Sequence, residues 1–459
     1  MTAPLVWWDV KQHIDRKDQD GLHQYAVLGH APEETGETPK PVLLNTNMPW
    51  SAFLCGSQGS GKSHTLSCML ENCMLEDDRI GKNPHPLAGL VFHYDSSQSS
   101  GMCEAAYLCS SIPTTVLVSP SNYGRLKQQY EAMAAKQGEE IKVERLRLLP
   151  SHLNTERVKT LMAVGKGDEI PLYMHLLIKI LRDMATEREG SGEFNYTDFV
   201  TRLASQSLMD KQNQPLQMRL HLLESFLDIP RKSPSLYSSS DSSPKALVRH
   251  TGPNNLIGRP GTLTVIDLTD PIIDADSACV LFDICLSVYL SQTHCGKIVA
   301  LDEAHNYMSE ESAAAKQFTG KLLKTIREQR HQGARVVIAT QEPTINTSLL
   351  DLCSITMVHR CTSPAWFTVL KKHVAALFLS KSNAGDGEEE NGQVDDRVLF
   401  EIIVRLKLGE SLLFCPTAAI DVEEEQGVLR MVGGYVKFRT RKRLTADGGQ
   451  SKLAGDASV

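Results

Sequence analysis

An α/β fold around a mainly parallel sheet is the fold class that this sequence predicts, and three features carry the prediction. Residues 56–63 read Gly-Ser-Gln-Gly-Ser-Gly-Lys-Ser, which is the G-x-x-x-x-G-K-[ST] spacing of a phosphate-binding P-loop. A short apolar run precedes this loop, and a helical pattern of apolar residues follows it. Later apolar runs, at 262–267 and 297–302, have the length of buried parallel strands and end in carboxylates.

The P-loop has a physical role for each of its residue types. Residues 52–55 are the expected strand before it, and its glycines let successive backbone N–H groups point inward at an anion. The helix that follows would present the positive end of its dipole to the same phosphates. We expect Lys62 to reach the β- and γ-phosphates and the Ser63 hydroxyl to bind Mg²⁺. The expected nucleotide-binding residues are Gly56, Ser57, Gln58, Gly59, Ser60, Gly61, Lys62, Ser63 and His64.

A second motif is the strand at 297–301, which ends in the adjacent carboxylates Asp302 and Glu303. Hydrolysis of a nucleoside triphosphate needs one carboxylate that holds the water shell of Mg²⁺ and another that takes a proton from the attacking water. Because only this strand supplies both, we expect Asp302 to have the metal role and Glu303 to be the base. Asp267, at the end of the competing strand, is expected to be structural, and His305 is expected to be a hydrogen-bond partner near the acids.

A third element follows these acids. Apolar residues recur every four positions from Phe318 to Ile326, which predicts a helix with one buried face that Gly333 ends as a C′ cap. Residues 335–339 then form another expected buried strand, which ends in Thr340-Gln341. If this strand lies beside the P-loop strand, Gln341 would lie next to the γ-phosphate and could position the attacking water.

With these motifs in place, the sequence resembles the HerA/FtsK superfamily of RecA-like ATPases, most closely its HerA-like branch. The resemblance rests on the segments 302–305, 326–333 and 339–343 and covers about 51–120 and 256–440. It implies a RecA-like core, assigned to these two ranges, that binds ATP with Mg²⁺ and hydrolyses it. The residues between, 121–255, would be a helical insertion.

The same resemblance implies partners for the chain. Members of the superfamily typically form hexameric rings that bind ATP between subunits, where an arginine of the neighbouring subunit completes the site. Arg327, Arg330 and Arg360 are the candidates for that arginine here, and the sequence leaves the choice open. Asp95 matches an acid at the tip of the family's second strand. Because the superfamily includes DNA-pumping motors and ATPases of secretion systems, double-stranded DNA or proteins are the expected partners.

Two features depart from the family pattern. HerA-type motors carry a β-barrel before the ATPase core, but only 50 residues precede Ser51 here, and we expect them to form a partly irregular segment. After Asp95, the run Ser-Ser-Gln-Ser-Ser is not the usual continuation. These departures concern the interpretation as a DNA motor and leave the ATPase assignment in place.

Composition sets further bounds. The chain has 459 residues, 41% of them hydrophobic, so it can bury a sizeable core. A net charge of −7 provides no global basic field that would attract nucleic acid. The 11 cysteines include no C-x-x-C pair, which indicates reduced thiols in a cytoplasmic or nuclear protein. We expect no membrane partner, because no apolar run has the length needed to span a bilayer and no signal-peptide pattern is present.

The expected insertion differs from the expected core in its sequence pattern. Apolar residues at helical spacing predict helices over 172–184 and 216–227, and a third is expected over 194–203 with Thr197 as its N-cap. A Ser-rich stretch at 232–255 and a Gly- and Glu-rich stretch at 382–396 are expected to be flexible loops.

The C-terminal residues carry a basic run, from Lys437 and Arg439 to Arg441-Lys442-Arg443. A nuclear localisation signal, a contact to a phosphate backbone and a charged edge strand are three explanations that the sequence leaves open. Residues 441–459 are expected to be a basic and then disordered tail.

Two other classes of function fit a P-loop. A nucleotide-dependent switch or scaffold would bind ATP, hydrolyse it slowly and act on protein partners through ordering of the insertion. A small-molecule kinase would transfer the phosphoryl group to an acceptor, but Glu303 is placed to activate water and no acceptor-binding motif is visible. An ATP-dependent hexamer would favour the motor over the switch, whereas a strict monomer would exclude the motor.

Overall fold

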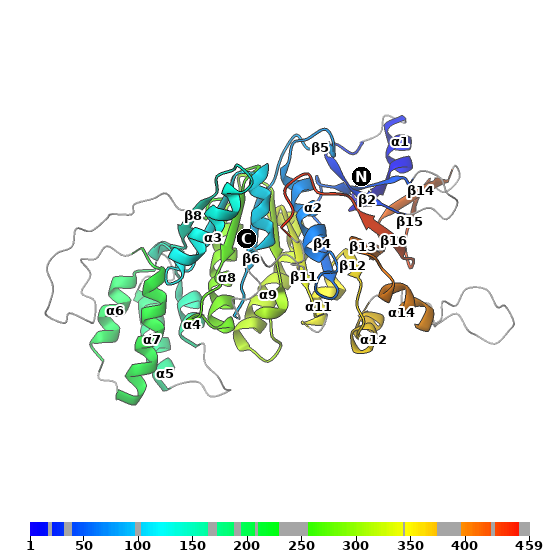
Figure 1. The fold of residues 1–459 in the computed structure, drawn as a ribbon. Helices are drawn as coiled ribbons and strands as arrows, with labels where there is room; N and C mark the ends of the chain where they lie inside the picture. Colours follow the sequence, from blue (N-terminus) through cyan, green and yellow to red (C-terminus); the bar gives the residue numbers. More distant parts are fainter. Residues whose placement is uncertain are drawn as a thin grey trace, which may run out of the picture.

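The fold is known from a computed structural model, which describes residues 1–16, 21–31, 39–96, 102–163, 172–187, 194–206, 210–228, 256–342, 345–373, 396–423 and 427–448. These residues form one 16-stranded sheet with helices on both faces (Figure 1). Three expected loops or tails fall wholly or mainly outside the described residues, namely 232–255, 382–396 and 449–459. Among the described helices, none is both long and apolar enough to cross a membrane.

Eight neighbouring strands form the parallel part of the sheet, in the order β8-β7-β9-β6-β10-β11-β4-β12. All but β8 are mostly or fully buried, which explains why they appear in the sequence as nearly continuous apolar runs. Their carboxyl ends therefore share one edge of the sheet. The strands are β4 (Ser51–Cys55), β6 (Ala88–His93), β7 (Thr114–Val118), β8 (Lys142–Arg145), β9 (Leu263–Asp267), β10 (Lys297–Leu301), β11 (Ala334–Thr340) and β12 (Ile355–His359).

The sheet continues beyond β12 as a largely antiparallel part, in the order β13-β16-β2-β3-β1-β14-β15, with β5 also paired to β2. Three of these strands come from the first 50 residues, so the expected partly irregular N-terminal segment contributes strands and the helix α1 (Trp8–Arg16) to the fold. The strands are β1 (Leu5–Trp7), β2 (Tyr25–His30), β3 (Pro41–Asn45), β5 (Gly81–Lys82), β13 (Glu410–Phe414), β14 (Ala419–Glu423), β15 (Gly427–Arg430) and β16 (Val436–Thr440).

Helices cover the two faces of the parallel part. On one face, α2 (Lys62–Met74), η1 (Glu104–Ser110) and α3 (Tyr123–Ala135) share an apolar cluster with alternate residues of the strands. On the other, α8 (Ala275–Leu290), α9 (Ala313–Arg327) and α11 (Thr347–Leu352) pack with the remaining strand residues. The two clusters follow the alternation of side chains along each strand.

Helix α9 ends earlier than the sequence predicts. Arg327 is its last residue, and the chain then forms the short helix α10 (Gln329–Gln332) before β11. Gly333, with φ 59°, is the C-cap of α10. The expected cap is therefore present, but it ends the second of two helices because the backbone breaks at Glu328.

In the described part of the expected insertion, four α-helices lie at one end of the molecule, far from the N-terminal strands (Figure 1). They are α4 (Thr155–Ala163), α5 (Leu172–Glu187), α6 (Tyr196–Ala204) and α7 (Asp210–Phe226). Asn195, and not Thr197, is the N-cap of α6, because its side chain accepts a hydrogen bond from the Asp198 amide. Strand β8 and helix α3 also lie within 121–255 but join the central sheet. The remaining α-helices that the structure describes, α12 (Pro364–His373) and α14 (Asp396–Val404), precede β13.

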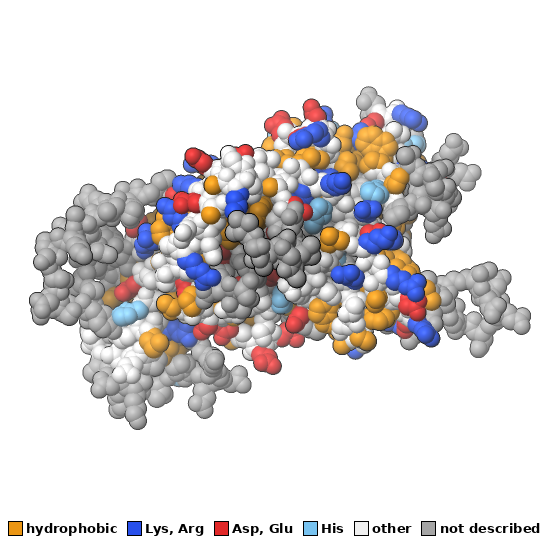
Figure 2. Space-filling view, in the orientation of Figure 1, with side chains coloured by type: hydrophobic (Ala, Val, Ile, Leu, Met, Phe, Trp, Pro, Cys, Tyr) orange, Lys and Arg blue, Asp and Glu red, His pale blue; other side chains and the backbone are white. Residues whose placement is uncertain are grey.

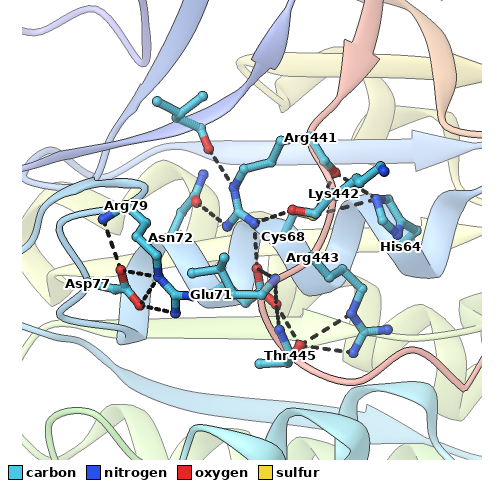
Figure 3. Close-up of polar contacts among 12 residues, drawn as sticks. His64, Cys68, Glu71, Asn72, Asp77, Arg79, Arg441, Lys442, Arg443 and Thr445 are labelled. Atoms are coloured by element: carbon cyan, nitrogen blue, oxygen red, sulfur yellow. Dashed lines mark hydrogen bonds and ion pairs between the residues drawn. The ribbon is translucent and has the colours of Figure 1, made fainter.

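The basic run at the C-terminus has a structural role that the three sequence explanations do not include. Strand β16 is paired on both sides, to β13 and β2, so it is not an edge strand. Residues 441–448 then cross α2 (Figure 3). The carboxylate of Glu71, which is fully buried in α2, accepts hydrogen bonds from Arg441 Nη1 at 2.7 Å and from the Thr445 amide at 2.9 Å.

Further contacts hold segment 441–448 in place. Arg441 also donates to Asn72 Oδ1 at 2.8 Å, and Arg443 donates to Glu104 Oε1 at 2.6 Å. The Ala446 amide donates to Ser110 Oγ, and the Gly448 amide donates to Glu104. Residues 446–448 are therefore bound to η1, which corrects the expectation of a disordered tail for these three residues.

Candidate functional site

The P-loop lies between β4 and α2, as its sequence predicts. Gly61, the residue before α2, has φ 104°, and a Cβ atom there would lie 2.9 Å from the Gly409 nitrogen. A side chain at this position would therefore meet both backbone strain and a clash. The Ser57 amide donates to the Arg360 carbonyl at 2.9 Å, which ties the loop to the end of β12.

Lys62 is almost fully buried in the first turn of α2, with 4% of its surface exposed. Among the described residues, its ammonium group donates to one acceptor, the Ser57 carbonyl at 3.1 Å. Burial lowers the pKa of Lys62, and the nearby carboxylates of Glu303 and Asp302 oppose that shift. A buried ammonium has three donors, so this side chain has the capacity to bind an anion.

Asp302 follows the last residue of β10 and is 3% exposed. Its amide donates to the Phe92 carbonyl at 3.0 Å, which holds the backbone beside β6. Its Oδ1 atom is buried and has no hydrogen-bond partner among the described residues. Burial raises the pKa of Asp302 to about 6. A buried carboxylate with an unpaired oxygen fits a cation, and Ser63 in the first turn of α2 has the oxygen chemistry for the same Mg²⁺ ion.

Glu303 has left-handed backbone angles, φ 47° and ψ 45°, which are uncommon for a residue other than glycine. Its Oε2 atom accepts a hydrogen bond of 3.0 Å from Gln341 Nε2. Gln341 follows β11, which pairs on one side with β10 and on the other with the P-loop strand β4. The strand order therefore brings the expected base and the expected water-positioning residue into direct contact.

His305 lies beside this pair. The Gln341 amide donates to His305 Nδ1 at 3.4 Å, so Nδ1 accepts and the ring is neutral. Burial lowers the pKa of His305, although the charge of Glu303 opposes the shift. The separation of 3.5 Å between His305 Nδ1 and Glu303 Oε2 is a contact between two acceptors in this tautomer, not a hydrogen bond.

The candidate arginines lie in two different places. The Arg360 carbonyl contacts the P-loop of its own chain, and its side chain is exposed. Arg327 and Arg330 lie at the end of α9 and in α10, next to the amino end of β11. They are exposed and form no ion pair with any described residue. Because the P-loop and the acids lie at the carboxyl ends of the strands, Arg327 and Arg330 are remote from the site within one chain.

Two other acids of the sequence analysis are buried, Asp267 at the end of β9 and Asp95 two residues after the end of β6. Asp95 is 4% exposed, and its amide donates to Thr269 Oγ1 at 3.2 Å. Asp267 accepts hydrogen bonds from Tyr130 Oη at 2.6 Å and from the Thr269 amide at 2.9 Å.

Three residues near the site were not identified from the sequence. His93 and Cys103 lie 3.8 Å and 3.9 Å from Asp302 Oδ2, measured from Nδ1 and Sγ. His359 is fully buried beside Gly56 and donates to the Glu410 carbonyl through Nδ1, and burial lowers its pKa to about 3. His93 could have been suspected from its position at the end of an apolar strand, but only the sheet register places it next to Asp302.

Comparisons with known proteins extend this description. No protein-family model and no curated protein matches the chain. Among solved structures, VirB4 of Thermoanaerobacter pseudethanolicus matches with a TM-score of 0.50 at 11% identity, over 92% of this chain and 97% of that chain. The genome packaging NTPase B204 of Sulfolobus turreted icosahedral virus 2, in complex with ATP-gammaS, has a TM-score of 0.30 at 8% identity, over 80% and 92%. EssC (ATPases 2 and 3) of Geobacillus thermodenitrificans has a TM-score of 0.32 at 11% identity, over 92% and 45%.

At this identity the VirB4 match shows the fold alone. It covers nearly all of both chains, and together with the strand order described above it confirms the predicted fold class. The chain has the fold of a RecA-like P-loop ATPase, with a large, mainly parallel central sheet.

Proposed function

We propose that this protein binds ATP with Mg²⁺ at its P-loop and hydrolyses it. One observation carries the proposal: the P-loop, the acid pair and Gln341 meet at the carboxyl ends of the neighbouring strands β4, β10 and β11. An open parallel sheet binds its ligands at this edge.

Each residue of the site would have a separate role in the reaction. The N–H groups of residues 56–63 and the amino end of α2 would bind the phosphates, and Lys62 would compensate their charge. Ser63 and Asp302 would hold Mg²⁺, which when bound would neutralise negative charge on the phosphates. Glu303 would take a proton from the attacking water. Gln341, which donates to Glu303 Oε2, would hold that carboxylate and contact the same water.

The direct test is the Glu303→Gln variant in a steady-state ATPase assay. We expect hydrolysis to fall by about 100-fold or more, because a positioned general base contributes roughly 10²–10⁴-fold. A fluorescent ATP analogue should still bind, since the P-loop is unchanged. Glu311→Gln, which alters an exposed acid, is the matched control and should leave activity unchanged. Full activity in Glu303→Gln would refute the assigned base.

We further propose that the chain works as a ring, hexameric by resemblance, in which an arginine of one subunit completes the site of the next. The exposure of Arg327, Arg330 and Arg360 supports this assembly, because all three are available to a neighbour. Double-stranded DNA is the substrate that the resemblance favours. The net charge of −7 gives no support to DNA binding by a single chain, and Lys and Arg side chains lie among Asp and Glu side chains on the face drawn in Figure 2.

Adding long double-stranded DNA to the ATPase assay tests this finer proposal. Stimulation of several-fold would support translocation along DNA. Hydrolysis that ignores DNA would direct the search to protein partners, and ATP binding without hydrolysis would favour a nucleotide-dependent switch.

A further inference from the structure

A row of polar side chains crosses three parallel strands at the edge that carries the site. Phe92 of β6 pairs with Leu301 of β10, so His93 and Asp302 are the next residues along each strand. His93 in turn pairs with Asp267 of β9. Neighbouring residues in register point to the same face of a sheet, so His93 lies between two carboxylates on the face that α2, η1 and α3 cover.

Cys103 approaches this row from the segment that covers it. It directly precedes η1, is fully buried, and its thiol lies 3.9 Å from Asp302 Oδ2. The Cys103 amide donates to Tyr130 Oη at 3.0 Å, and that hydroxyl donates to Asp267 Oδ2 at 2.6 Å. These hydrogen bonds hold Cys103 against the row of polar side chains, in the way that hydrogen bonds from neighbouring residues orient metal ligands.

His93 has an unusual environment for a buried histidine. It is 3% exposed, and neither of its ring nitrogens has a hydrogen-bond partner among the described residues. Leaving a buried polar atom unpaired costs about 1–3 kcal/mol, so each such atom in a native protein calls for an ordered water or an ion.

The geometry and chemistry of the cluster favour an ion. One ligand atom from each of His93, Cys103 and Asp302 lies within 4.8 Å of the other two. In a tetrahedral zinc site with bonds of about 2.0–2.3 Å, the ligand atoms are separated by roughly 3.3–3.6 Å, so the side chains need to move by about 1 Å or less. A nitrogen, a sulfur and an oxygen suit Zn²⁺, whereas Mg²⁺ requires oxygen ligands.

We propose that His93, Cys103 and Asp302 form a second metal site, for a thiophilic divalent cation of which Zn²⁺ is the best match, and that its occupation inhibits the enzyme. The thiol loses its proton to solvent as the metal–sulfur bond forms. Asp302 is then engaged by zinc and is withdrawn from Mg²⁺. Zinc binding stands on the cluster alone, but the inhibition rests on the proposed ATPase function.

Cobalt binding to the metal-free full-length protein tests the site without using activity. Co²⁺ bound to a thiolate gives an intense near-ultraviolet charge-transfer band, and we expect this band to appear at one equivalent and to disappear when Zn²⁺ is added. Cys103→Ala should abolish it. Cys109→Ala, which removes another buried cysteine of the same segment, should retain it. A band that survives in Cys103→Ala, or no band in the wild type, would overturn the proposal.

A second variant protects this test against misfolding. Cys103→Ser keeps the size of the side chain and replaces a strong zinc ligand by a weak one, so it should fold as the wild type does in circular dichroism. Its zinc affinity, measured by competition with a chelator, should fall by more than the 10–100-fold that loss of an outer contact costs. An unchanged affinity in a folded Cys103→Ser protein would also refute the site.

The inhibition is tested by titrating Zn²⁺ into the ATPase assay at excess Mg²⁺. The zinc concentration that half-inhibits Cys103→Ala should be at least about 10-fold higher than the concentration that half-inhibits the wild type. This threshold is cautious, because the loss of one metal ligand should lower the zinc affinity by more than about 10-fold. Equal sensitivity would show that zinc acts elsewhere, for example on ATP itself, and would overturn the inhibitory role. If the protein hydrolyses no ATP, the function proposal fails and the cobalt experiment still decides the metal site.

Discussion

Glu303 shows how a single backbone conformation sets the direction of a side chain. If β10 continued as a strand, Glu303 would point to the face opposite Asp302, because side chains alternate along a strand. The left-handed conformation, φ 47°, turns the chain sharply at this position instead. Its carboxylate can then meet Gln341. The sequence predicted the acid pair from residue type alone, but no local pattern indicated this turn.

The conformation should carry a measurable cost. An L-residue in the left-handed region is destabilised by about 1–2 kcal/mol, and glycine is not. We therefore expect Glu303→Gly to unfold at a higher denaturant concentration than Glu303→Ala, by about 1 kcal/mol in free energy of unfolding. Both variants lack the side chain, so the comparison isolates the backbone. Equal stability would mean that the strain is relieved elsewhere.

The pKa of Asp302 predicts that the stability of the folded protein depends on pH. Burial raises its pKa from 3.8 to about 6, so the folded state binds a proton more tightly than the unfolded state does. The stability of the metal-free protein should therefore fall as pH rises from about 4 to 6, and the loss should be complete above pH 6. Asp302→Asn removes this term and should be more stable at pH 8 by about 3 kcal/mol.

Chemical denaturation of Asp302→Asn and the wild type at several pH values checks this expectation. The difference in free energy of unfolding should disappear below about pH 4, where the aspartate is protonated in both states. A difference that does not change with pH would contradict the assigned cause.

At the scale of elements, the sequence predicted those helices and strands that can be recognised from a short window of residues. The P-loop and its helix, β10 and β11 follow from glycine spacing and apolar runs, and the structure has them where the sequence indicates. The strands β1, β2 and β3 were not predicted. They are short, and their pairing depends on distant segments, since β2 pairs with β16 and β1 with β14. Pairing between strands that lie far apart in the sequence leaves no signal within a window of about 10 to 20 residues.

Segment 441–448 was missed for a different reason. A run of basic residues is usually solvated, and its buried partner lies some 370 positions earlier in α2. One signal was present, because Glu71 stands among apolar and small residues of the helix after the P-loop. A lone acid in such a helix is expected to need a buried cation.

The contact between Arg441 and Glu71 leads to a testable prediction at the scale of elements. Burial raises the pKa of Glu71, but Arg441 and the Thr445 hydrogen bonds outweigh it and hold that pKa below its ordinary value of 4.5. Arg441→Ala leaves the buried carboxylate without its cation and should lower the free energy of unfolding by about 3 kcal/mol at pH 7. Arg439→Ala, at an exposed position of β16, is the control and should change it by less than about 0.5 kcal/mol.

The sign of the pH effect follows from the same pKa. A lowered pKa contributes stability above pH 4.5 that is lost as pH falls through the folded-state value. The gap between Arg441→Ala and the wild type should therefore narrow in acid. A gap that is constant from pH 7 to pH 3 would show that lost packing, and not charge, destabilises the variant.

At the scale of the whole molecule, the proposed ring gives the exposed arginines a testable role. Arg327 and Arg330 are remote from the site of their own chain, so in the proposed ring either would act in the site of a neighbour. If Arg327 is the arginine that acts between subunits, Arg327→Ala and Glu303→Gln should each be inactive alone and should regain ATPase activity when mixed. In the mixture, some interfaces combine an intact Glu303 with an intact arginine. The same experiment with Arg330→Ala and Arg360→Ala identifies the residue that acts between subunits.

Light scattering gives the complementary measurement. An ATP-dependent hexamer is the expected result. A strict monomer, or the absence of any regained activity with all three arginine variants, would rule out a shared site.

The pairing of β2 with β16 has a consequence for how the protein is made. Arg441, just after β16, donates to the carbonyl of Val27 in β2, across a separation of 414 positions. A ribosome that adds about 5–20 residues per second takes on the order of a minute to produce the chain between them. During this time β2 lacks its β16 neighbour, so an unpaired strand edge is exposed on the nascent chain. The sheet therefore cannot be completed until β16 has been synthesised, and the chain has most need of a chaperone before then.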